Sequence, residues 1–513
     1  MNLISQIKNT KKRDIILFIS VFLVACAVRL ILFGAHPAGL NQDEASIGYD
    51  AWSLLHYGVD RNGYTLPVHL MAWGSGQNAL YAYLSMPFIG LFGLNVVTVR
   101  AVNLIFSLLT VVAVYSTLKQ AVNKRTAFIG MALTAAVPWN IMLARWGLES
   151  NLFPALLMLS IWALLRATKN KKFFYVAAVI LSLSLYSYGS AYLVITLFAA
   201  AVFVLFIIKK PVPLHTLFIG AAVYIVISVP IYLFAIINVF QLEGIQIGIL
   251  SIPRLYGNRI DAQNGATFVD FFKNLYQFVF LQTDGTERNA FPFYGCYYVI
   301  SIPFMIAGIV RAVKKRTEFD FIVLFALICS ILLFGYYNAP NINRVNAIYM
   351  PLILLTATGL GSLLKSRRAV LAVALSYVIC FAGFNFKYFG TEYRESIGKE
   401  FCDGFGEAIN KSVELSRGKS TVHISSSNMP YIYALFYAQT PTDEFLNTVK
   451  YENPGAMFQR VESFSNFKFS TDTRSFEPDG EGIYLIDASL KETAETKTSE
   501  IYNYKNFIVA VIK

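Results

Sequence analysis

Long apolar runs, separated by short clusters of lysine and arginine, dominate this sequence. A run of about 20 apolar residues is long enough to cross a bilayer as a helix, and lysine-rich and arginine-rich loops lie on the cytoplasmic side. Of the 513 residues, 56% are hydrophobic and only 14% are charged, whereas charged residues make up about a quarter of a soluble chain. The sequence therefore predicts an integral membrane protein.

The basic clusters also predict how the chain is threaded. When every cluster is placed inside, the chain crosses the bilayer about eleven times and no apolar run is left out. This predicts an α-helical polytopic protein of the plasma membrane, with a cytoplasmic N-terminus and a membrane domain over residues 1–389. Its first outer loop spans 34–96, with interfacial helices at 45–57 and 79–92, and its second spans 240–292. The net charge of +12 is then a feature of topology, and nucleic acid is excluded as a partner.

Residues 390–513 differ from the rest, because apolar residues become fewer and no spanning run remains. Residues 401–415 have the pattern of an amphipathic helix. Three β-branched or aromatic runs predict strands at 421–425, 482–486 and 507–512. A helix alternating with strands indicates a small α/β domain, which the topology places on the extracytoplasmic side.

Three carboxylates, Asp43, Glu44 and Asp50, follow the first apolar run, in the first outer loop. On a helix, Asp43 and Asp50 share one face while Glu44 points elsewhere. Ionisable groups this close to a membrane are functional candidates, and a carboxylate here can deprotonate an acceptor hydroxyl while cations hold a phosphate leaving group. The alternative is an acidic helix N-cap, since Asp and Glu stabilise a helix N-terminus. The stretch alone leaves both interpretations open.

Two further outer corners carry arginine. Arg145 and Glu149 are four residues apart, which permits an ion pair within one helix as well as a functional pair. Arg344 stands alone in a polar corner, where it can anchor at the lipid headgroups or clamp a lipid phosphate with its planar guanidinium. Aromatic residues such as Trp52 and Tyr188 are also dense in the outer corners. Their ordinary role is the interfacial belt, and the alternative is a platform on which a sugar ring packs.

Several of these segments together resemble the GT-C superfamily of polyprenyl-phosphate-sugar-dependent glycosyltransferases. The resemblance is to the bacterial protein-mannosyltransferase type, which includes the lipid A aminoarabinose transferases, and it runs from about Ile15 to Lys365. The segments that carry it are the Asp43-Glu44 pair, Ala45 to Tyr57, Ala79 to Leu84 leading to Phe92-Gly93-Leu94, Val99-Arg100, and Pro138 to Asn151.

The resemblance implies roles for individual residues. Asp43 falls on the family's catalytic aspartate, with Glu44 beside it, and Glu149 falls on the acidic corner between the third and fourth helices. Where the family often has a basic residue that contacts the lipid phosphate, this chain has Gln77 followed by Asn78. We therefore expect Arg344 or Arg145 to hold the phosphate, and Glu149, Asp50, Gln77, Asn78, Trp52 and Tyr188 to contact sugar or acceptor.

The sequence thus predicts an inverting glycosyltransferase that moves a sugar from a polyprenyl-phosphate donor to an acceptor hydroxyl on a glycan, a lipid or a protein. Membrane lipids are its other partners. The sequence establishes no cofactor, and metal dependence stays open because Asp43, Glu44 and Asp50 could hold a divalent cation. One alternative is a transporter or flippase for lipid-linked glycans, which would place ionisable groups near the midplane of the bilayer. Another is a polymerase or ligase of cell-surface polysaccharide.

Overall fold

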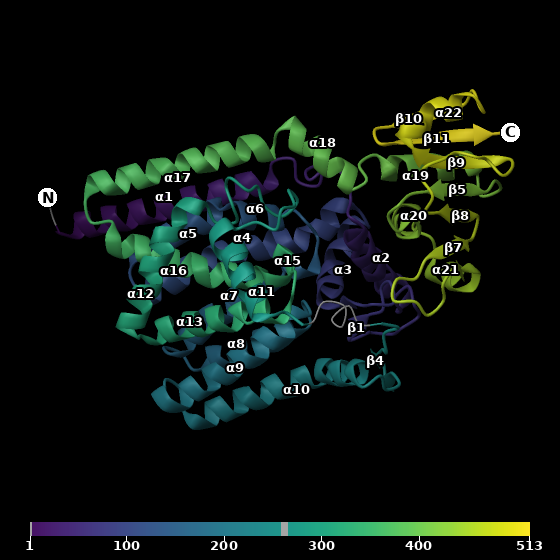
Figure 1. Cartoon of the computed structure of the whole chain (residues 1–513). Helices are drawn as coiled ribbons and strands as arrows, with labels where there is room; N and C mark the ends of the chain where they lie inside the picture. The colour runs from purple at the N-terminus through teal and green to yellow at the C-terminus, as the bar shows by residue number, and fades with distance from the viewer. Residues whose placement is uncertain (1–2, 258–264) are drawn as a thin grey trace. The chain divides into compact units, whose positions relative to one another are not determined.

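The computed structural model describes residues 3–257 and 265–513, which form two compact units. We call them the helical unit and the loop–sheet unit (Figure 1). The helical unit contains Met1–Phe33, Asn103–Val229 and Gln263–Tyr388. The loop–sheet unit contains Gly34–Val102, Pro230–Ala262 and Phe389–Lys513.

Each apolar run expected to span the membrane folds as a helix or as a helix with a short interruption. These helices are α1 (Leu3–Leu30), α4 (Val96–Ala121), α5 (Lys124–Ala136) with α6 (Pro138–Leu143), α7 (Phe153–Ala167), α8 (Lys172–Leu185), α9 (Ser190–Lys209), α10 (Leu214–Val239), α12 (Ile302–Lys315), α13 (Glu318–Ile331) with α14 (Leu333–Tyr336), α16 (Tyr349–Leu363) and α17 (Arg367–Tyr388).

Among the described residues, seven of these helical segments are long and apolar enough to cross a membrane. They are α4, α7 with the preceding turn, α9, α10, α13 with α14, α16 with the preceding turns, and α17. Helices α5, α8 and α12 have 13 to 14 residues, fewer than a full crossing needs. The chain is therefore a multi-pass membrane protein, and the number of about eleven crossings stays a prediction.

Helix α16 lies at the centre of the helical unit, since 89% of the most apolar stretch of Ile342–Leu363, which contains it, is buried, against 6% for that of α17. It packs closely on α12 through two glycines, Gly308 and Gly359. A Cβ added at either position would overlap backbone atoms of the facing helix, the carbonyl of Leu355 or of Phe304. Small residues at a crossing let two helix backbones approach each other closely.

In the loop–sheet unit, the first outer loop folds as expected into two short helices, α2 (Gln42–Tyr57) and α3 (Leu80–Phe92). Between them, strands β1 (His69–Leu70) and β2 (Gln77–Asn78) form a short antiparallel pair. The second outer loop contains the hairpin of β3 (Ile245–Ile247) and β4 (Leu250–Ile252), and its helix α11 (Phe268–Leu275) belongs to the helical unit. Residues 258–264 of that loop lie outside the described residues.

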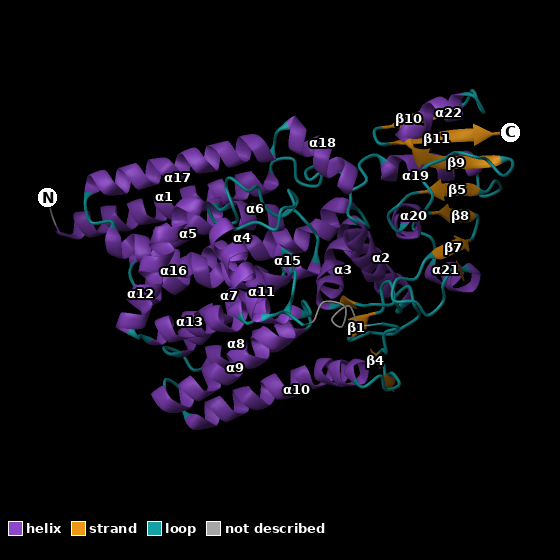
Figure 2. Ribbon diagram, viewed as in Figure 1, coloured by secondary structure: helices purple, strands orange, loops and turns teal. Residues whose placement is uncertain are grey.

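The C-terminal residues form the predicted α/β structure around a seven-stranded sheet of order β10-β11-β9-β5-β8-β7-β6 (Figure 2). Its strands are β5 (Val422–Ser425), β6 (Lys450–Tyr451), β7 (Val461–Phe464), β8 (Phe467–Ser470), β9 (Gly482–Asp487), β10 (Ile501–Tyr504) and β11 (Phe507–Ile512). Strand β5 pairs in parallel with β8 and β9, and the other pairs are antiparallel. The three predicted strands correspond to β5, β9 and β11 and are confirmed.

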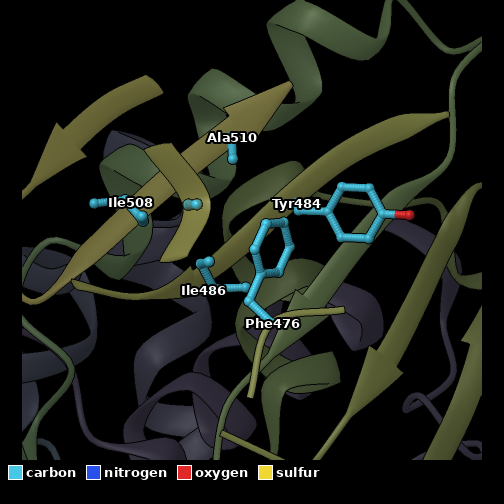
Figure 3. Close-up of a cluster of buried hydrophobic side chains, with 6 residues drawn as sticks. Phe476, Tyr484, Ile486, Ile508 and Ala510 are labelled. Atoms are coloured by element: carbon cyan, nitrogen blue, oxygen red, sulfur yellow. The ribbon is translucent and has the colours of Figure 1, made fainter. Parts of the chain in front are cut away.

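Helices α18 (Thr391–Glu400), α19 (Phe405–Ser416), α20 (Pro430–Ala438), α21 (Thr442–Thr448) and α22 (Lys491–Glu495) accompany the sheet. Helix α19 begins four residues later than predicted, because Gly404 before it has a left-handed φ of 94°. Side chains from β9, β11 and the loop at Phe476 form a buried apolar cluster (Figure 3). This cluster is a hydrophobic core for the C-terminal part of the unit.

Candidate active site

Helix α2 begins at Gln42 because a capping box stabilises its first turn. The side chain of Asn41 accepts a hydrogen bond from the Asp43 N–H at 3.0 Å, and the Glu44 carboxylate accepts one from the Asn41 N–H at 3.0 Å. This arrangement satisfies two backbone donors that a helix N-terminus otherwise leaves unpaired. Of the two adjacent acidic residues, Glu44 is therefore the one whose side chain caps the helix.

A buried ion pair holds the Glu44 carboxylate. Arg100, in the first turns of α4, donates to its two oxygens from Nε at 2.8 Å and from Nη2 at 2.9 Å, and both side chains are fully buried. The same guanidinium donates to the carbonyls of Gly34, Pro37 and Gly39. Arg100 thus ties the segment before α2 to the helix, and this geometry favours a structural role for Glu44.

Asp43, by contrast, is only half-buried. Its backbone carbonyl accepts a hydrogen bond from Gln77 Nε2 at 3.4 Å. Its carboxylate lies close enough to Tyr433 to contribute to the raised pKa of that phenol, for which burial is the largest cause. Of the two adjacent carboxylates, Asp43 is therefore the one that a substrate can reach more easily.

A stripe of polar side chains continues along α2 from Asp43 through Ser46 to Asp50, so the two aspartates share a face as predicted. Ser46 donates to Gln77 Oε1 at 2.9 Å and accepts from Arg61 Nη2 at 2.8 Å. The Arg61 N–H donates to Asp50 Oδ1 at 3.2 Å, and its Nη1 lies 3.7 Å from Asp50 Oδ2. Asp50 is fully buried. Its environment is that of a buried polar network and not of an open binding surface.

Two residues that were not predicted from the sequence, Asp60 and Arg61, complete this network. The Asp60 side chain accepts from the N–H groups of Asn62 and Tyr64. Burial, together with the neighbouring Asp50 charge, raises the pKa of Asp60 to about 7. The Arg61 guanidinium lies 4.9 Å from the centre of the Trp73 ring. A charged pair between glycines and asparagine is typical of a solvated loop, so no local signal in the sequence marked these two residues.

The other candidates in the loop–sheet unit are largely buried. Gln77 and Asn78 form strand β2 and are 4% exposed. Trp52 is 9% exposed and packs against the rings of Tyr49, His56 and Tyr57. Its ring is therefore part of an aromatic cluster along α2.

In the helical unit, Arg145 binds the end of helix α1. Its guanidinium donates to the carbonyls of Val28 at 3.3 Å, Arg29 at 2.7 Å and Ile31 at 2.7 Å. Residues 144–148 are not helical and Glu149 begins a separate turn, so the alternative of an ion pair within one helix does not apply. Arg145 is fully buried and Glu149 is 8% exposed.

Arg344 has a different environment at the corner before α16. It lies in the short helix α15 (Ile342–Val345), whose N-cap is Asn341. The Asp284 carboxylate fixes this corner by accepting a hydrogen bond from the Ile342 N–H at 2.9 Å. The guanidinium of Arg344 is half-buried and lies 5.4 Å from the centre of the Tyr337 ring. Arginine stacks on aromatic faces and its planar fork matches a phosphate, so a phosphate clamp remains the functional candidate for Arg344.

The predicted site residues thus fall into two sets. Asp43, Glu44, Asp50, Trp52, Gln77 and Asn78 belong to the loop–sheet unit, where α2 and β2 bring them together. Arg145, Glu149, Tyr188 and Arg344 belong to the helical unit. Within that unit, Asn346 beside Arg344 donates to the Ser150 carbonyl beside Glu149 at 2.9 Å, and Tyr188 is a half-buried residue of the turn after α8.

The residues that could hold a divalent cation are largely committed to arginine. Arg100 binds both oxygens of Glu44, and Arg61 pairs with Asp50. In the part of the chain that the structure describes, no group of three or more His, Cys, Asp or Glu residues is arranged to hold a metal ion. The carboxylates of Glu44 and Asp50 are therefore paired with arginine side chains.

Comparisons with known proteins agree with this fold. Residues 78–233 match the family model of dolichyl-phosphate-mannose-protein mannosyltransferases. ArnT from Cupriavidus metallidurans, bound to undecaprenyl phosphate, superposes with a TM-score of 0.57 at 12% identity, covering 96% of this chain and 97% of that chain. The apo structure of the same protein gives a TM-score of 0.56, covering 98% of each chain.

A more distant match is the archaeal oligosaccharyltransferase AglB from Archaeoglobus fulgidus, solved with an inhibitory peptide and a dolichol-phosphate. Its TM-score is 0.53 at 13% identity, covering 84% of this chain and 64% of that chain. No curated protein sequence matches the chain. In the sequence of its segment 78–233 and in its overall fold, the chain is similar to the polyprenyl-phosphate-sugar-dependent glycosyltransferases of the GT-C superfamily, and the predicted resemblance is confirmed.

Proposed function

We propose that the protein is an inverting glycosyltransferase of the plasma membrane. It takes a sugar from a polyprenyl-phosphate donor at the outer face and transfers it to an acceptor hydroxyl. The family match over residues 78–233 supports this class of reaction. The undecaprenyl phosphate bound by ArnT and the dolichol-phosphate bound by AglB support a polyprenyl carrier.

The observation that carries the proposal is the contrast between Asp43 and Glu44. Arg100 and the backbone of Asn41 occupy the Glu44 carboxylate, while Asp43 is half-buried at the first turn of α2. A helix N-terminus favours the ionised form of a carboxylate, and a general base must be ionised before it can accept a proton. Asp43 is thus the general base of the proposed reaction.

The reaction then proceeds in one displacement. The acceptor hydroxyl gives its proton to Asp43, and its oxygen forms a bond to the anomeric carbon. The bond from that carbon to the phosphate oxygen breaks, and polyprenyl phosphate leaves with the bonding electrons. Attack opposite the leaving group inverts the anomeric configuration.

Arg344 is the residue we assign to the leaving phosphate. Its guanidinium packs on Tyr337, and arginine's planar fork matches two phosphate oxygens. Arg145 donates to three carbonyls of α1, so we assign it to holding that helix. Glu149, Gln77, Asn78, Trp52 and Tyr188 remain candidates for contacts with sugar or acceptor, and Glu44 and Asp50 position α2.

Replacing Asp43 tests the proposal directly. We expect D43N to reduce transfer about 10²- to 10⁴-fold, the range that general base catalysis contributes, because an amide cannot accept the proton. Purified protein in proteoliposomes is given undecaprenyl phosphate carrying radiolabelled mannose, with an envelope extract as acceptor. A parallel assay uses an aminoarabinose donor.

The matched control is D472N, the same chemical change at an exposed carboxylate, which should transfer at the wild-type rate. NMR of the product should show the anomeric configuration opposite to that of the donor. Retained configuration, or normal transfer by a folded D43N protein, would reject the proposed mechanism. Movement of intact donor across the vesicle membrane without its consumption would support a flippase instead.

A further inference from the structure

The segment immediately before Asp43 is held by residues from the C-terminal region. The Leu40 N–H donates to the Phe401 carbonyl at 2.6 Å, and the Leu40 carbonyl accepts from the Tyr433 hydroxyl at 3.1 Å, across 393 residues of sequence. All three residues belong to the loop–sheet unit, and each is 1% exposed. Both backbone polar groups of Leu40 are therefore satisfied in a buried environment, where an unsatisfied group would be costly.

The turn that receives Leu40 is itself fixed. At the end of α18, the Phe401 N–H donates to the Ile397 carbonyl at 2.8 Å, and the Asp403 N–H donates to the Gly398 carbonyl at 2.7 Å. The two chains approach so closely that a Cβ at Gly39 would overlap the Phe401 carbonyl, and the φ of Gly39 is +82°. Only glycine fits this position without strain. The contact is thus between two rigid turns.

Tyr433 holds the Leu40 carbonyl from a second direction, and its own ring is fixed by packing. It lies on α20, which packs on α2, and its ring packs edge-on against Phe405 at 5.1 Å. A packed tyrosine ring has few rotamers, so its hydroxyl holds a defined position. From there it bonds the residue that precedes the N-cap Asn41, three positions before Asp43.

The C-terminal region contacts the middle of α2 as well. The Tyr49 hydroxyl donates to the Thr440 carbonyl at 2.7 Å, and the hydroxyls of Ser53 and Thr442 are 2.7 Å apart. Polar contacts therefore hold α2 at successive turns on the side where residues 430–448 lie. Because each contact is directional, together they specify both the rotation of the helix and its position along its axis.

We propose that the C-terminal α/β region positions the catalytic turn, and that Tyr433 is the positioning residue at its end. The region acts on Asp43 through the backbone of Leu40 and through α2. The effect on catalysis rests on the proposed function, in which Asp43 is the general base. A base displaced by about 1 Å can lower the rate about 10²-fold. The C-terminal region is then part of the catalytic machinery in a structural sense, without touching the reacting atoms.

The test compares Y433F with Y484F in the full-length protein. Both changes remove one hydrogen-bonded tyrosine hydroxyl from the C-terminal region, and the Tyr484 hydroxyl bonds Asp479 instead of the first outer loop. In Y433F we expect faster amide hydrogen exchange in the peptide covering residues 38–45. We also expect kcat to fall about tenfold with the donor KM within twofold, in the mannose-donor assay described above. Y484F should change neither, and the unfolding temperatures of the two variants should agree.

Each readout has a contradicting result. Unchanged exchange at residues 38–45 in Y433F, or an equal change in Y484F, would overturn the positioning role. If exchange rises in Y433F while D43N transfers normally, the proposed base is wrong and the positioning role stands. If Y433F does not fold, the wild-type protein decides: the Leu40 amide must exchange as slowly as the strands β5 and β9, and exchange as fast as the loop at 58–63 would reject the proposal.

Discussion

Two corners of the molecule bury arginine in opposite ways. At the end of α1 in the helical unit, Arg29 donates five hydrogen bonds, four to backbone carbonyls and one to the Ser107 hydroxyl. Arg145 donates to three further carbonyls of the same helix end. Around α2 in the loop–sheet unit, Arg100 and Arg61 pair with the carboxylates of Glu44 and Asp50.

The type of partner, carbonyl or carboxylate, indicates which of the two corners can respond to ligands or to pH. Carbonyls at a helix C-terminus lack partners within the helix and carry its negative dipole, so arginines bound to them serve as caps. A carboxylate partner adds a second ionisable group, and around α2 the acids outnumber the arginines once Asp60 is included. We therefore expect function and pH sensitivity at α2 and structural stability at the end of α1.

The largest effect should follow from breaking the Glu44–Arg100 pair. R100M leaves a buried carboxylate without its partner, and breaking such a pair costs about 3–5 kcal/mol. The double variant E44Q/R100M should recover part of this loss, because it removes both charges. Unfolding of the detergent-solubilised proteins measures both values. A single variant that is as stable as wild type would show that the pair does not hold the segment before α2.

A smaller effect on stability is expected from Asp60, the third buried acid of the network around α2. Because burial and Asp50 raise the pKa of Asp60 to about 7, the folded protein binds a proton there more tightly than the unfolded chain does. This contribution to stability is present below about pH 4 and is lost as the pH rises to about 7. D60N keeps the acceptor for Asn62 and Tyr64 and stays neutral, so it should be more stable than wild type at pH 8 by roughly 2–4 kcal/mol.

The measurement is the unfolding free energy of both proteins from pH 4 to pH 8. The two curves should meet at the acid end and separate towards the alkaline end. D472N, a change at an exposed carboxylate paired with Arg474, controls for general charge effects. Parallel curves for D60N and wild type would show that Asp60 is ionised throughout this range in the folded protein.

Much of the fold followed from the sequence, because it depends on local pattern. The apolar runs became helices, and the alternation of β-branched residues located β5, β9 and β11. The other four strands of the sheet, β6, β7, β8 and β10, were missed, because they are only two to four residues long and polar or charged residues at their exposed positions leave them few apolar residues. The start of α2 was placed three residues late, since Ala45 begins the apolar pattern but the capping box of Asn41 and Glu44 begins the helix.

The site was less predictable, because its partners are distant in sequence. The sequence singled out Asp43 and Glu44 as candidates but did not indicate that an arginine holds Glu44, since Arg100 lies 56 residues from it. Tyr433 is farther still from the segment that it holds, and no pattern links the two. Arg145 showed the opposite problem, because its spacing to Glu149 allowed an ion pair within one helix as one alternative, whereas residues 144–148 are not helical and the guanidinium binds the end of α1.

The smallest effect tests which kind of arginine holds the lipid phosphate. R344Q removes a guanidinium that packs on Tyr337, and we expect it to weaken the binding of undecaprenyl phosphate about 10- to 100-fold, which corresponds to about 1.4–2.7 kcal/mol. R145Q removes the cap of α1, so it should lower the unfolding temperature while undecaprenyl phosphate binds with nearly wild-type affinity. Titration of the purified proteins with that lipid measures both affinities without any assumption about the sugar. If R145Q lost affinity and R344Q kept it, a carbonyl-bound arginine would be the phosphate ligand. The expectation that arginines at the end of α1 serve only stability would then be wrong.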